Sequence, residues 1–314
     1  MSPAYRPSRL FANPHVATIY AARLARRETV RYRRERWDTP DGDFIDVDFV
    51  DGPPDAPRVV MFHGLEGSSR SAYARALMAA VARRGWRGAV PHFRGCSGEL
   101  NRRPRAYHSG DSAEADWILR RLADGAPLHA AGISLGGNVL AKWCGEAGEA
   151  GRSIVTRAAS VCAPIDLRIS GFALDRGFPR VYTWNFLRTM KRSAEARLRL
   201  HPGLFDAERM RRARTFHEFD DTVTAPLHGF AGVADYYARA SAGPLLPGVR
   251  VPLLLLNALD DPFVPVAALP EPSRLPAAVV ADYPTHGGHV GFVGAAGALD
   301  WLPGRLLRFF DEGR

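Results

Sequence analysis

Ser134 lies at the centre of the stretch Gly-Ile-Ser-Leu-Gly, residues 132–136, which matches the pattern G-x-S-x-G. An apolar run precedes this stretch and a helical pattern follows it, which is the context in which the pattern carries a reactive serine. The glycines allow a sharp turn that leaves the serine Oγ exposed. A serine hydroxyl is a weak nucleophile that needs a general base within hydrogen-bond reach, and an acid to orient that base. The chemistry that Ser134 suggests is acyl transfer, and both partners must come from elsewhere in the chain.

Candidates for the acid follow an apolar run late in the chain. Asp260 and Asp261 come directly after Leu-Leu-Leu-Leu-Asn-Ala-Leu, at the point where a strand would end. We favour Asp261, because an Asp-Pro pair with two apolar residues behind it is the usual placing of this acid. Asp260 remains the alternative. We expect the carboxylate that is not the acid to cap a helix or to accept hydrogen bonds from the loop backbone.

Two histidines lie in the stretch 281–292, which follows the last predicted strand. The resulting order of serine, acid and histidine is one that such triads take. We favour His289 as the base, because Gly288 and Gly291 give the chain around it the freedom to aim an imidazole. His286 remains the alternative, and we otherwise expect it to support the loop.

The oxyanion that develops during acyl transfer needs hydrogen-bond donors. The backbone N–H of Leu135, directly after the nucleophile, is one candidate. The N–H of Leu65 is the other, because His63-Gly64 ends an early apolar run and the following loop would point toward the same site. We expect His63 itself to hold this loop and to take no part in the chemistry.

The elements that must position these residues are short apolar strands alternating with amphipathic helices. This alternation predicts a mostly parallel sheet covered by helices on both faces, within a single α/β domain spanning residues 1–314. A hairpin, in whose two strands polar and apolar residues alternate, precedes these elements. The predicted strands are 29–37, 43–50, 58–64, 88–93, 128–134, 158–164, 251–258 and 277–284, and the predicted helices lie near 70–84, 112–123, after Gly136 and at 298–313.

The interval 166–245 interrupts this alternation with helical, arginine-rich and aromatic sequence. Ligands bind at the carboxyl ends of the strands in such sheets, so we interpret the interval as a helical cap inserted over that edge. Its aromatic residues predict an apolar ester as the substrate, and its arginines raise the hypothesis that an anionic substrate is attracted. The aromatic residues meant are Phe172, Trp184, Phe186, Phe216 and Phe230.

The composition narrows the choice of partners and compartment. The formal charge is +9, but the arginines are mixed with acids along helical stretches and no nucleic-acid motif occurs, so we predict no nucleic-acid partner. Association with a membrane surface stays open, although nothing indicates it. The three cysteines show no disulfide or zinc spacing, and no signal peptide or spanning segment is recognisable. We therefore predict a cytoplasmic protein.

Several motifs taken together resemble the YheT-like branch of the α/β-hydrolases. These are HGLEGSSRSAYAR, FRGCSGELNRRPRAYHSGD, GISLGGN, FDDTVTAPLHGF, LNALDDPFVP and HGGHVGF. The resemblance runs from about Phe11 to the C-terminal helix. It implies an α/β-hydrolase fold with an inserted helical cap and assigns nucleophile, acid and base to Ser134, Asp261 and His289. Members of this group include carboxylesterases, lipid-ester hydrolases and some alcohol acyltransferases.

We therefore expect a serine esterase that cleaves carboxylic esters, with hydrophobic acyl groups, through an acyl-enzyme intermediate. The expected partner is a small-molecule or lipid-like ester, and no metal or organic cofactor is needed. Two alternatives stay open, namely alcohol acyl transfer from the same intermediate and a catalytically silent binding scaffold. The sequence leaves the oligomeric state undetermined.

Overall fold

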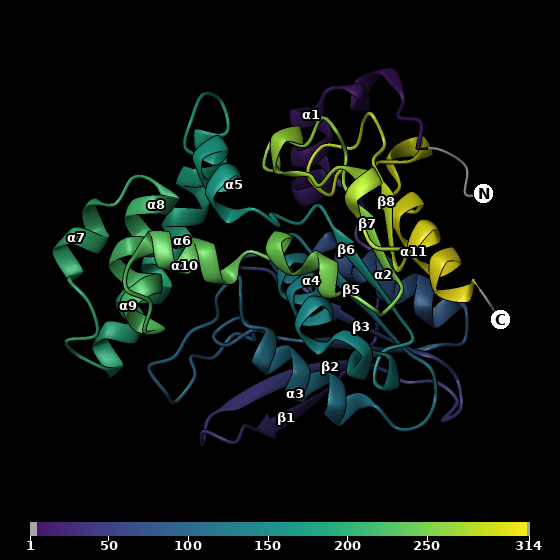
Figure 1. Cartoon of the computed structure of the whole chain (residues 1–314), viewed down its shortest axis with the longest axis horizontal. Coiled ribbons are helices and arrows are strands. Elements are labelled where there is room, and N and C mark those ends of the chain that lie inside the picture. The colour runs from purple at the N-terminus through teal and green to yellow at the C-terminus, as the bar shows by residue number, and fades with distance from the viewer. Residues whose placement is uncertain (1–4, 313–314) are drawn as a thin grey trace.

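A computed structural model describes residues 5–312 and contains one eight-stranded sheet (Figure 1). The strand order is β1-β2-β4-β3-β5-β6-β7-β8, and β2 runs antiparallel to both β1 and β4 while the other neighbouring strands are parallel. The sheet is therefore mostly parallel, as the sequence predicts. The strands are β1 Arg33–Asp38, β2 Phe44–Val50, β3 Arg58–Phe62, β4 Arg87–Pro91, β5 Leu128–Ile133, β6 Arg157–Val161, β7 Leu253–Leu256 and β8 Val279–Asp282.

Helices cover the sheet and form a lobe beside it (Figure 1). The α-helices are α1 Pro14–Ile19, α2 Ala72–Arg83, α3 Ser112–Leu122, α4 Leu135–Ala147, α5 Leu167–Leu174, α6 Arg180–Leu200, α7 Ala207–Arg212, α8 Phe216–Phe219, α9 Ala225–Leu227, α10 Val233–Ala240 and α11 Trp301–Asp311. Shorter helical turns are Arg9–Ala12, Tyr20–Leu24, Gly148–Ser153, Asp220–Thr224, Gly243–Gly248, Val266–Ala268, Pro272–Arg274 and Ala295–Gly297.

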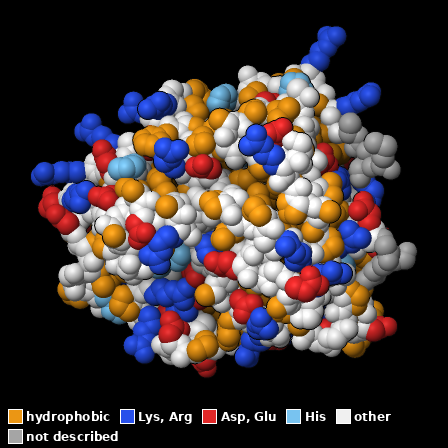
Figure 2. Space-filling model, in the orientation of Figure 1, with side chains coloured by type: hydrophobic (Ala, Val, Ile, Leu, Met, Phe, Trp, Pro, Cys, Tyr) orange, Lys and Arg blue, Asp and Glu red, His pale blue; other side chains and the backbone are white. Residues whose placement is uncertain are grey.

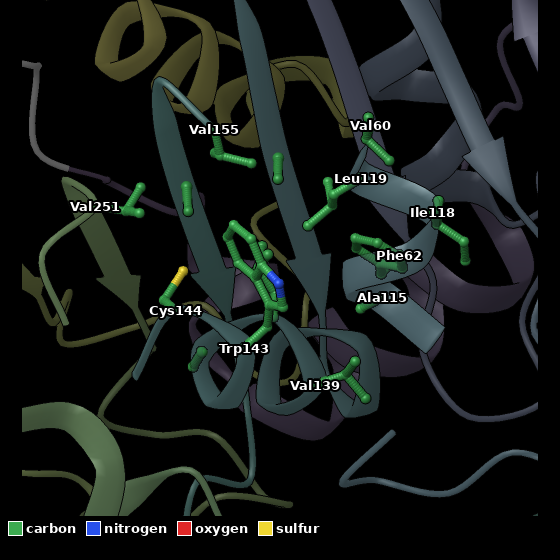
Figure 3. Packing of buried hydrophobic residues seen from close by; sticks show 14 of the residues in the cluster. Val60, Phe62, Ala115, Ile118, Leu119, Val139, Trp143, Cys144, Val155 and Val251 are labelled. Carbon is green, nitrogen blue, oxygen red and sulfur yellow. The ribbon is translucent and has the colours of Figure 1, made fainter. Parts of the chain in front are cut away.

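Side chains from the central strands pack into two hydrophobic layers. On β3, Val60 and Phe62 pack in the layer with α3 and α4, whereas Val59 and Met61 pack with α2 and α11. Successive residues of a strand point to opposite faces, and both faces of this sheet are covered by helices. This is why the strands read as continuous apolar runs in the sequence. Figure 3 shows the first layer, in which Trp143 of α4 lies among side chains from several strands and α3.

The hairpin β1–β2 departs from the half-buried strands expected from its alternating pattern. Every residue of β2 is buried, because β2 lies between β1 and β4. Its acidic side chains are held by cation partners on β1, where Arg34 Nε lies 2.6 Å from Asp48 Oδ1 and Arg36 Nε lies 2.8 Å from Asp46 Oδ1. Buried carboxylates are tolerated when paired in this way.

The segment between β6 and β7 contains α5 to α10, which form the lobe at the left of Figure 1. It has small apolar clusters of its own, one around Leu187 and Met210 and another around Tyr236 and Tyr237. Its chain also returns to the main body, since the Gly243 N–H donates to the Ile165 carbonyl at 2.9 Å. The segment thus leaves and rejoins the sheet at closely spaced points.

The mixture of basic and acidic residues noted in the sequence is also visible on the surface. Figure 2 shows basic and acidic side chains interspersed over one face of the molecule. Over the part of the chain that the structure describes, no helix combines the length and apolar character needed to cross a membrane.

Candidate active site

The turn that carries Ser134 joins the end of β5 to the start of α4. Ser134 has φ 54° and ψ −119°, a conformation that side-chain-bearing residues rarely adopt. A Cβ at Gly136 would lie 2.4 Å from the Phe62 carbonyl oxygen, and one at Gly132 would lie 2.3 Å from the Gly136 carbonyl oxygen. Both positions therefore require glycine because backbone passes through the space that a side chain would need. The close packing forces the sharp turn that presents the Ser134 hydroxyl.

Three predicted site residues from distant parts of the chain come together at this turn. His289 Nε2 lies 2.9 Å from Ser134 Oγ, and His289 Nδ1 lies 2.9 Å from Asp261 Oδ2. The Asp261 carboxylate is buried, with the residue 4% exposed, and Oδ1 accepts hydrogen bonds from the N–H groups of Phe263 (2.8 Å) and Val264 (3.2 Å). With Nδ1–H donated to the carboxylate, Nε2 is free to accept the serine proton.

Contacts outside these three residues fix the histidine. The His289 N–H donates to Thr18 Oγ1 at 2.9 Å, and Thr18 Oγ1 in turn donates to the Pro14 carbonyl at 2.7 Å. The Phe263 ring stacks on the imidazole with centroids 4.0 Å apart. The N-terminal helix α1 thus supports the loop that carries His289. Sequence reasoning did not identify Thr18 or Phe263, and only the position of Phe263 behind the Asp-Pro pair could have drawn attention to it.

The alternative acid and base form a separate pair. Asp260 Oδ2 lies 3.1 Å from His286 Nδ1, and Asp260 Oδ1 accepts a hydrogen bond from the Gly288 N–H at 2.8 Å. The Asp260 carboxylate therefore holds the backbone of the loop next to His289. The His286 side chain is 42% exposed and supports this loop.

The two candidate oxyanion donors border the same cavity as Ser134. Leu65 and Leu135 both line it, and within residues 5–312 neither of their N–H groups donates a hydrogen bond. The preceding residue is anchored, because the Gly64 N–H donates to the Tyr73 hydroxyl at 2.9 Å. Free backbone N–H groups beside a nucleophile can bind a developing oxyanion.

His63 holds the loop that contains Leu65. Its Nε2 accepts a hydrogen bond from the Phe93 N–H at 3.1 Å, and its Nδ1 lies 2.8 Å from the Gly64 carbonyl oxygen, to which it donates. Burial lowers the pKa of His63 to about 3, so the imidazole is neutral at physiological pH. With its proton on Nδ1, the neutral ring connects the loop after β3 to the loop after β4.

The cavity that contains Ser134 is lined largely by apolar side chains from the segment between β6 and β7. These include Leu167, Leu174, Phe186, Met190, Phe216, Phe219, Val223 and Leu227. Of the aromatic residues singled out in the sequence, Phe186 and Phe216 line the cavity. Phe172 and Trp184 are 45% and 64% exposed, and Phe230 packs against Tyr236. The sequence does not distinguish the aromatic residues that line the cavity from those that do not. Which face of each helix points into the cavity depends on the turns between the helices.

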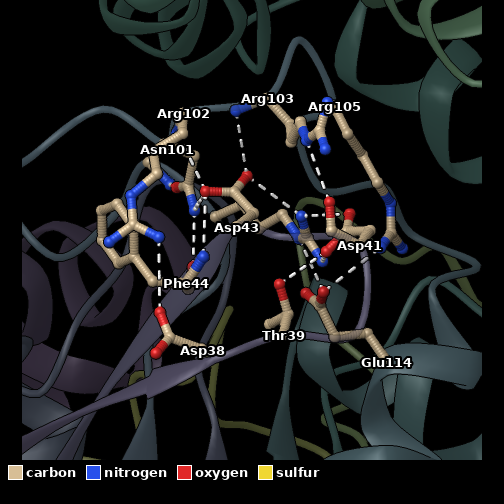
Figure 4. Close-up of polar contacts among 12 residues, drawn as sticks. Asp38, Thr39, Asp41, Asp43, Phe44, Asn101, Arg102, Arg103, Arg105 and Glu114 are labelled. Atoms are coloured by element: carbon tan, nitrogen blue, oxygen red, sulfur yellow. Dashed lines mark hydrogen bonds and ion pairs between the residues drawn. The ribbon is translucent and has the colours of Figure 1, made fainter.

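A largely buried network of charges joins Arg94, in the loop between β4 and α3, to carboxylates of the β1–β2 turn and of α3. Arg94 lies at its centre, with nitrogen–oxygen distances of 2.8 Å to Asp41, 3.1 Å to Asp43 and 2.6 Å to Glu114. Figure 4 shows the carboxylates of this network with the neighbouring Asn101 and arginines. The network fixes the loop beside the cavity that contains Ser134, which Arg94, Gly95 and Cys96 help to line. Burial raises the pKa of the Cys96 thiol in this loop, so it stays protonated and unreactive.

The described residues contain one group with metal-ligand atom types close together, namely Cys162, Asp261 and His289, whose atoms lie within 4.8 Å of one another. Two of these residues already bond to each other in the chain that leads to Ser134. Cys162 Sγ accepts a hydrogen bond from the Val290 N–H at 3.4 Å. The geometry therefore fits hydrogen bonding better than metal binding.

A buried carboxyl in the cavity wall predicts a specific dependence of stability on pH. Burial raises the pKa of Asp220 from 3.8 to about 7, although hydrogen bonds from Thr224 and Tyr237 oppose the shift. The folded state then binds this proton more tightly than the unfolded chain, so its stabilising effect is full below about pH 3.8 and is lost as pH rises toward 7.

Between pH 5 and pH 8, we expect this titration to lower the free energy of unfolding of the wild type by on the order of 2 kcal/mol, and we expect Asp220→Asn to abolish that decrease. Denaturant unfolding of both proteins at the two pH values measures it. Thr224→Ser, which keeps the hydroxyl 2.6 Å from Asp220, is the control and should retain the wild-type slope. Parallel pH profiles for wild type and Asp220→Asn would show that Asp220 is ionised throughout.

Comparison with known proteins agrees with this architecture. Residues 57–294 match the family model described as alpha/beta hydrolase fold. The chain is 42% identical to "Putative esterase YheT" of Escherichia coli (strain K12), over 97% of this chain and 92% of that protein. It is 28% identical to "Phospholipase ABHD3" of Mus musculus, over 88% of this chain and 70% of that protein.

Among solved structures, the Pyrococcus furiosus esterase Pf2001 superposes with a TM-score of 0.57 at 14% identity, covering 89% of this chain and 91% of that one. This likeness concerns the fold. The family match and the identity to YheT extend over most of the chain. The chain therefore belongs to the α/β-hydrolase fold family and to its YheT-like branch.

Proposed function

We propose that the protein is a serine esterase that hydrolyses carboxylic esters at Ser134. The observation that carries this proposal is the continuous hydrogen-bond chain from Ser134 through His289 to Asp261, in which both links are 2.9 Å long. An α/β-hydrolase fold and relatives named as an esterase and a phospholipase support the same reaction class.

The proposed reaction has two steps. His289 Nε2 takes the Ser134 proton while Oγ attacks the ester carbonyl, and the N–H groups of Leu65 and Leu135 stabilise the oxyanion. His289 then gives the proton to the leaving alcohol. In the second step His289 takes a proton from water, which attacks the acyl-enzyme, and then returns that proton to Ser134 Oγ as the acid is released. Asp261 keeps the imidazole in the required tautomer and stabilises its protonated form.

The substrate class follows from the cavity. Its apolar lining favours a hydrophobic acyl or alcohol group beside Ser134. We propose that residues 166–245 act as a cap of a single α/β-hydrolase domain, because side chains from this segment line the cavity together with Ser134. The cap would exclude water from the bound ester and strengthen the hydrogen bonds to the oxyanion.

Ester hydrolysis by acyl chain length tests this proposal. We expect kcat/KM for p-nitrophenyl esters to rise by about tenfold or more from acetate to the best longer chain, since each buried methylene contributes about 0.8 kcal/mol. Added ethanol separates the reactions, because an acyltransferase forms ethyl ester in place of acid. A flat chain-length profile would contradict the apolar acyl site. The absence of any turnover would favour the silent scaffold.

A further inference from the structure

A second arginine lies in the wall of the cavity that contains Ser134, at a site distinct from the network around Arg94. Arg197 is on α6, is 7% exposed and lines the cavity. A Cβ at Gly95 would lie 3.4 Å from its Nη2, so the guanidinium rests against the backbone of the loop after β4. Both α6 and that loop therefore hold this side chain at the cavity wall.

Unlike the other arginine of the cavity wall, Arg197 lacks an acidic partner. Within residues 5–312 its guanidinium forms no hydrogen bond and no ion pair within 4.0 Å. Arg94, which lines the same cavity, is bound by three carboxylates. A buried cation without a partner lowers stability unless a ligand supplies the missing charge.

The polar groups around Arg197 do not pair with its guanidinium directly. The charges of Glu66 and Asp43 act on Arg197 from a distance, but within residues 5–312 neither carboxylate lies within 4.0 Å of its guanidinium nitrogens. Glu66 Oε1 accepts a hydrogen bond from the Tyr107 hydroxyl at 3.0 Å, and Asp43 is paired with Arg94. Burial raises the pKa of the Glu66 carboxyl, although the charge of Arg197 opposes this shift. Burial also raises the pKa values of Cys96 and Tyr107, so both stay neutral. Burial lowers the pKa of Arg197 itself, as expected for an uncompensated cation.

We propose that Arg197 binds an anionic group of the substrate, so that the preferred ester carries a carboxylate or a phosphate besides the ester that reacts with Ser134. A guanidinium presents N–H donors in a planar fork that fits either anion with two parallel hydrogen bonds. The mostly apolar lining elsewhere would bind the hydrocarbon part. The inference rests on the proposed esterase function and adds the substrate class.

Matched esters test the proposal in the full-length protein. The set comprises butyl hexanoate, monobutyl adipate, and the hexanoate esters of 4-hydroxybutyrate and 4-hydroxybutyl phosphate, with acid release followed in a pH-stat. We expect wild type to prefer at least one anionic ester over butyl hexanoate by about 30-fold. The preferred ester shows which anion is bound and whether it belongs to the acyl or the alcohol side.

Arg197→Gln should lower kcat/KM for the preferred anionic ester by about 30-fold and for butyl hexanoate by less than about threefold. Arg197→Lys should retain part of the preference, because it keeps the charge without the fork. Arg192→Gln is the control, since Arg192 is an exposed residue of the same helix. Equal losses on neutral and anionic esters would assign Arg197 a structural role, and no preference in wild type would also overturn the proposal.

A binding measurement separates failure of this inference from failure of the esterase proposal. In the Ser134→Ala background, millimolar hexanoate or hexyl phosphate should raise Tm, because a ligand that binds the folded state stabilises it. The further change Arg197→Gln should remove that shift. If no ester is turned over but the shift and its loss are observed, the esterase proposal fails while the anion site stands. Absence of a shift with both anions would overturn the anion site.

Discussion

Replacing Ser134 with alanine is expected to lower kcat for ester hydrolysis by about 10⁶-fold, the size of loss seen when a nucleophile of a serine triad is removed. The hydroxyl contacts His289 Nε2 at 2.9 Å and supplies the only proposed bond to the acyl group. Alanine keeps the Cβ, so the turn after β5 retains its packing. The measurement is kcat with the best ester from the chain-length series, together with Tm.

Ser153→Ala is the matched control, because Ser153 is exposed and its Oγ donates only to the Ala150 carbonyl at 2.8 Å. It should leave kcat within about twofold of wild type. A Ser134→Ala protein that folds normally and keeps more than about 1% of the activity would contradict the assignment of the nucleophile.

The second large effect distinguishes the two neighbouring carboxylates. Asp261→Asn should lower kcat by about 10⁴-fold, because an amide that donates to Nδ1 leaves the proton on Nε2, facing Ser134. Asp260→Asn should lower kcat by less than about tenfold, since Asp260 bonds to His286 and to the Gly288 backbone, outside the chain to the serine.

The two substitutions are matched in size and charge and affect adjacent residues, so each serves as the control for the other. Steady-state kinetics across pH 5–9, with Tm measured alongside, checks both. A larger loss for Asp260→Asn than for Asp261→Asn would reverse the assignment of the acid.

Much of the fold could be predicted because a covered parallel sheet leaves a strong pattern. Apart from the buried His129 of β5, the runs that become β3, β5 and β7 are apolar at their inner positions, since each strand faces a helical layer on both sides. The turn at Ser134 is equally readable, because the pattern G-x-S-x-G spans only five residues and Gly132 is required by the Gly136 carbonyl oxygen within the same turn. Local requirements of this kind are visible in a single sequence.

Features that depend on contacts between distant segments could not be predicted. Thr18 supports His289 across a separation of 271 residues, and nothing in the sequence around Thr18 indicates this. Arg197 is one arginine among many on α6, and its burial depends on the loop after β4. The inward faces of the helices α5 to α10 likewise follow from how these helices turn against one another, which residue type alone does not reveal.

The most direct test of the central claim is covalent labelling of Ser134 by a fluorophosphonate, followed by intact mass measurement. Such a reagent reacts with a serine activated by a general base and an oxyanion site. We expect one adduct on wild type, none on Ser134→Ala, and much slower labelling of Asp261→Asn than of Asp260→Asn. An unlabelled wild type, or equal labelling of wild type and Ser134→Ala, would contradict an activated serine at this position.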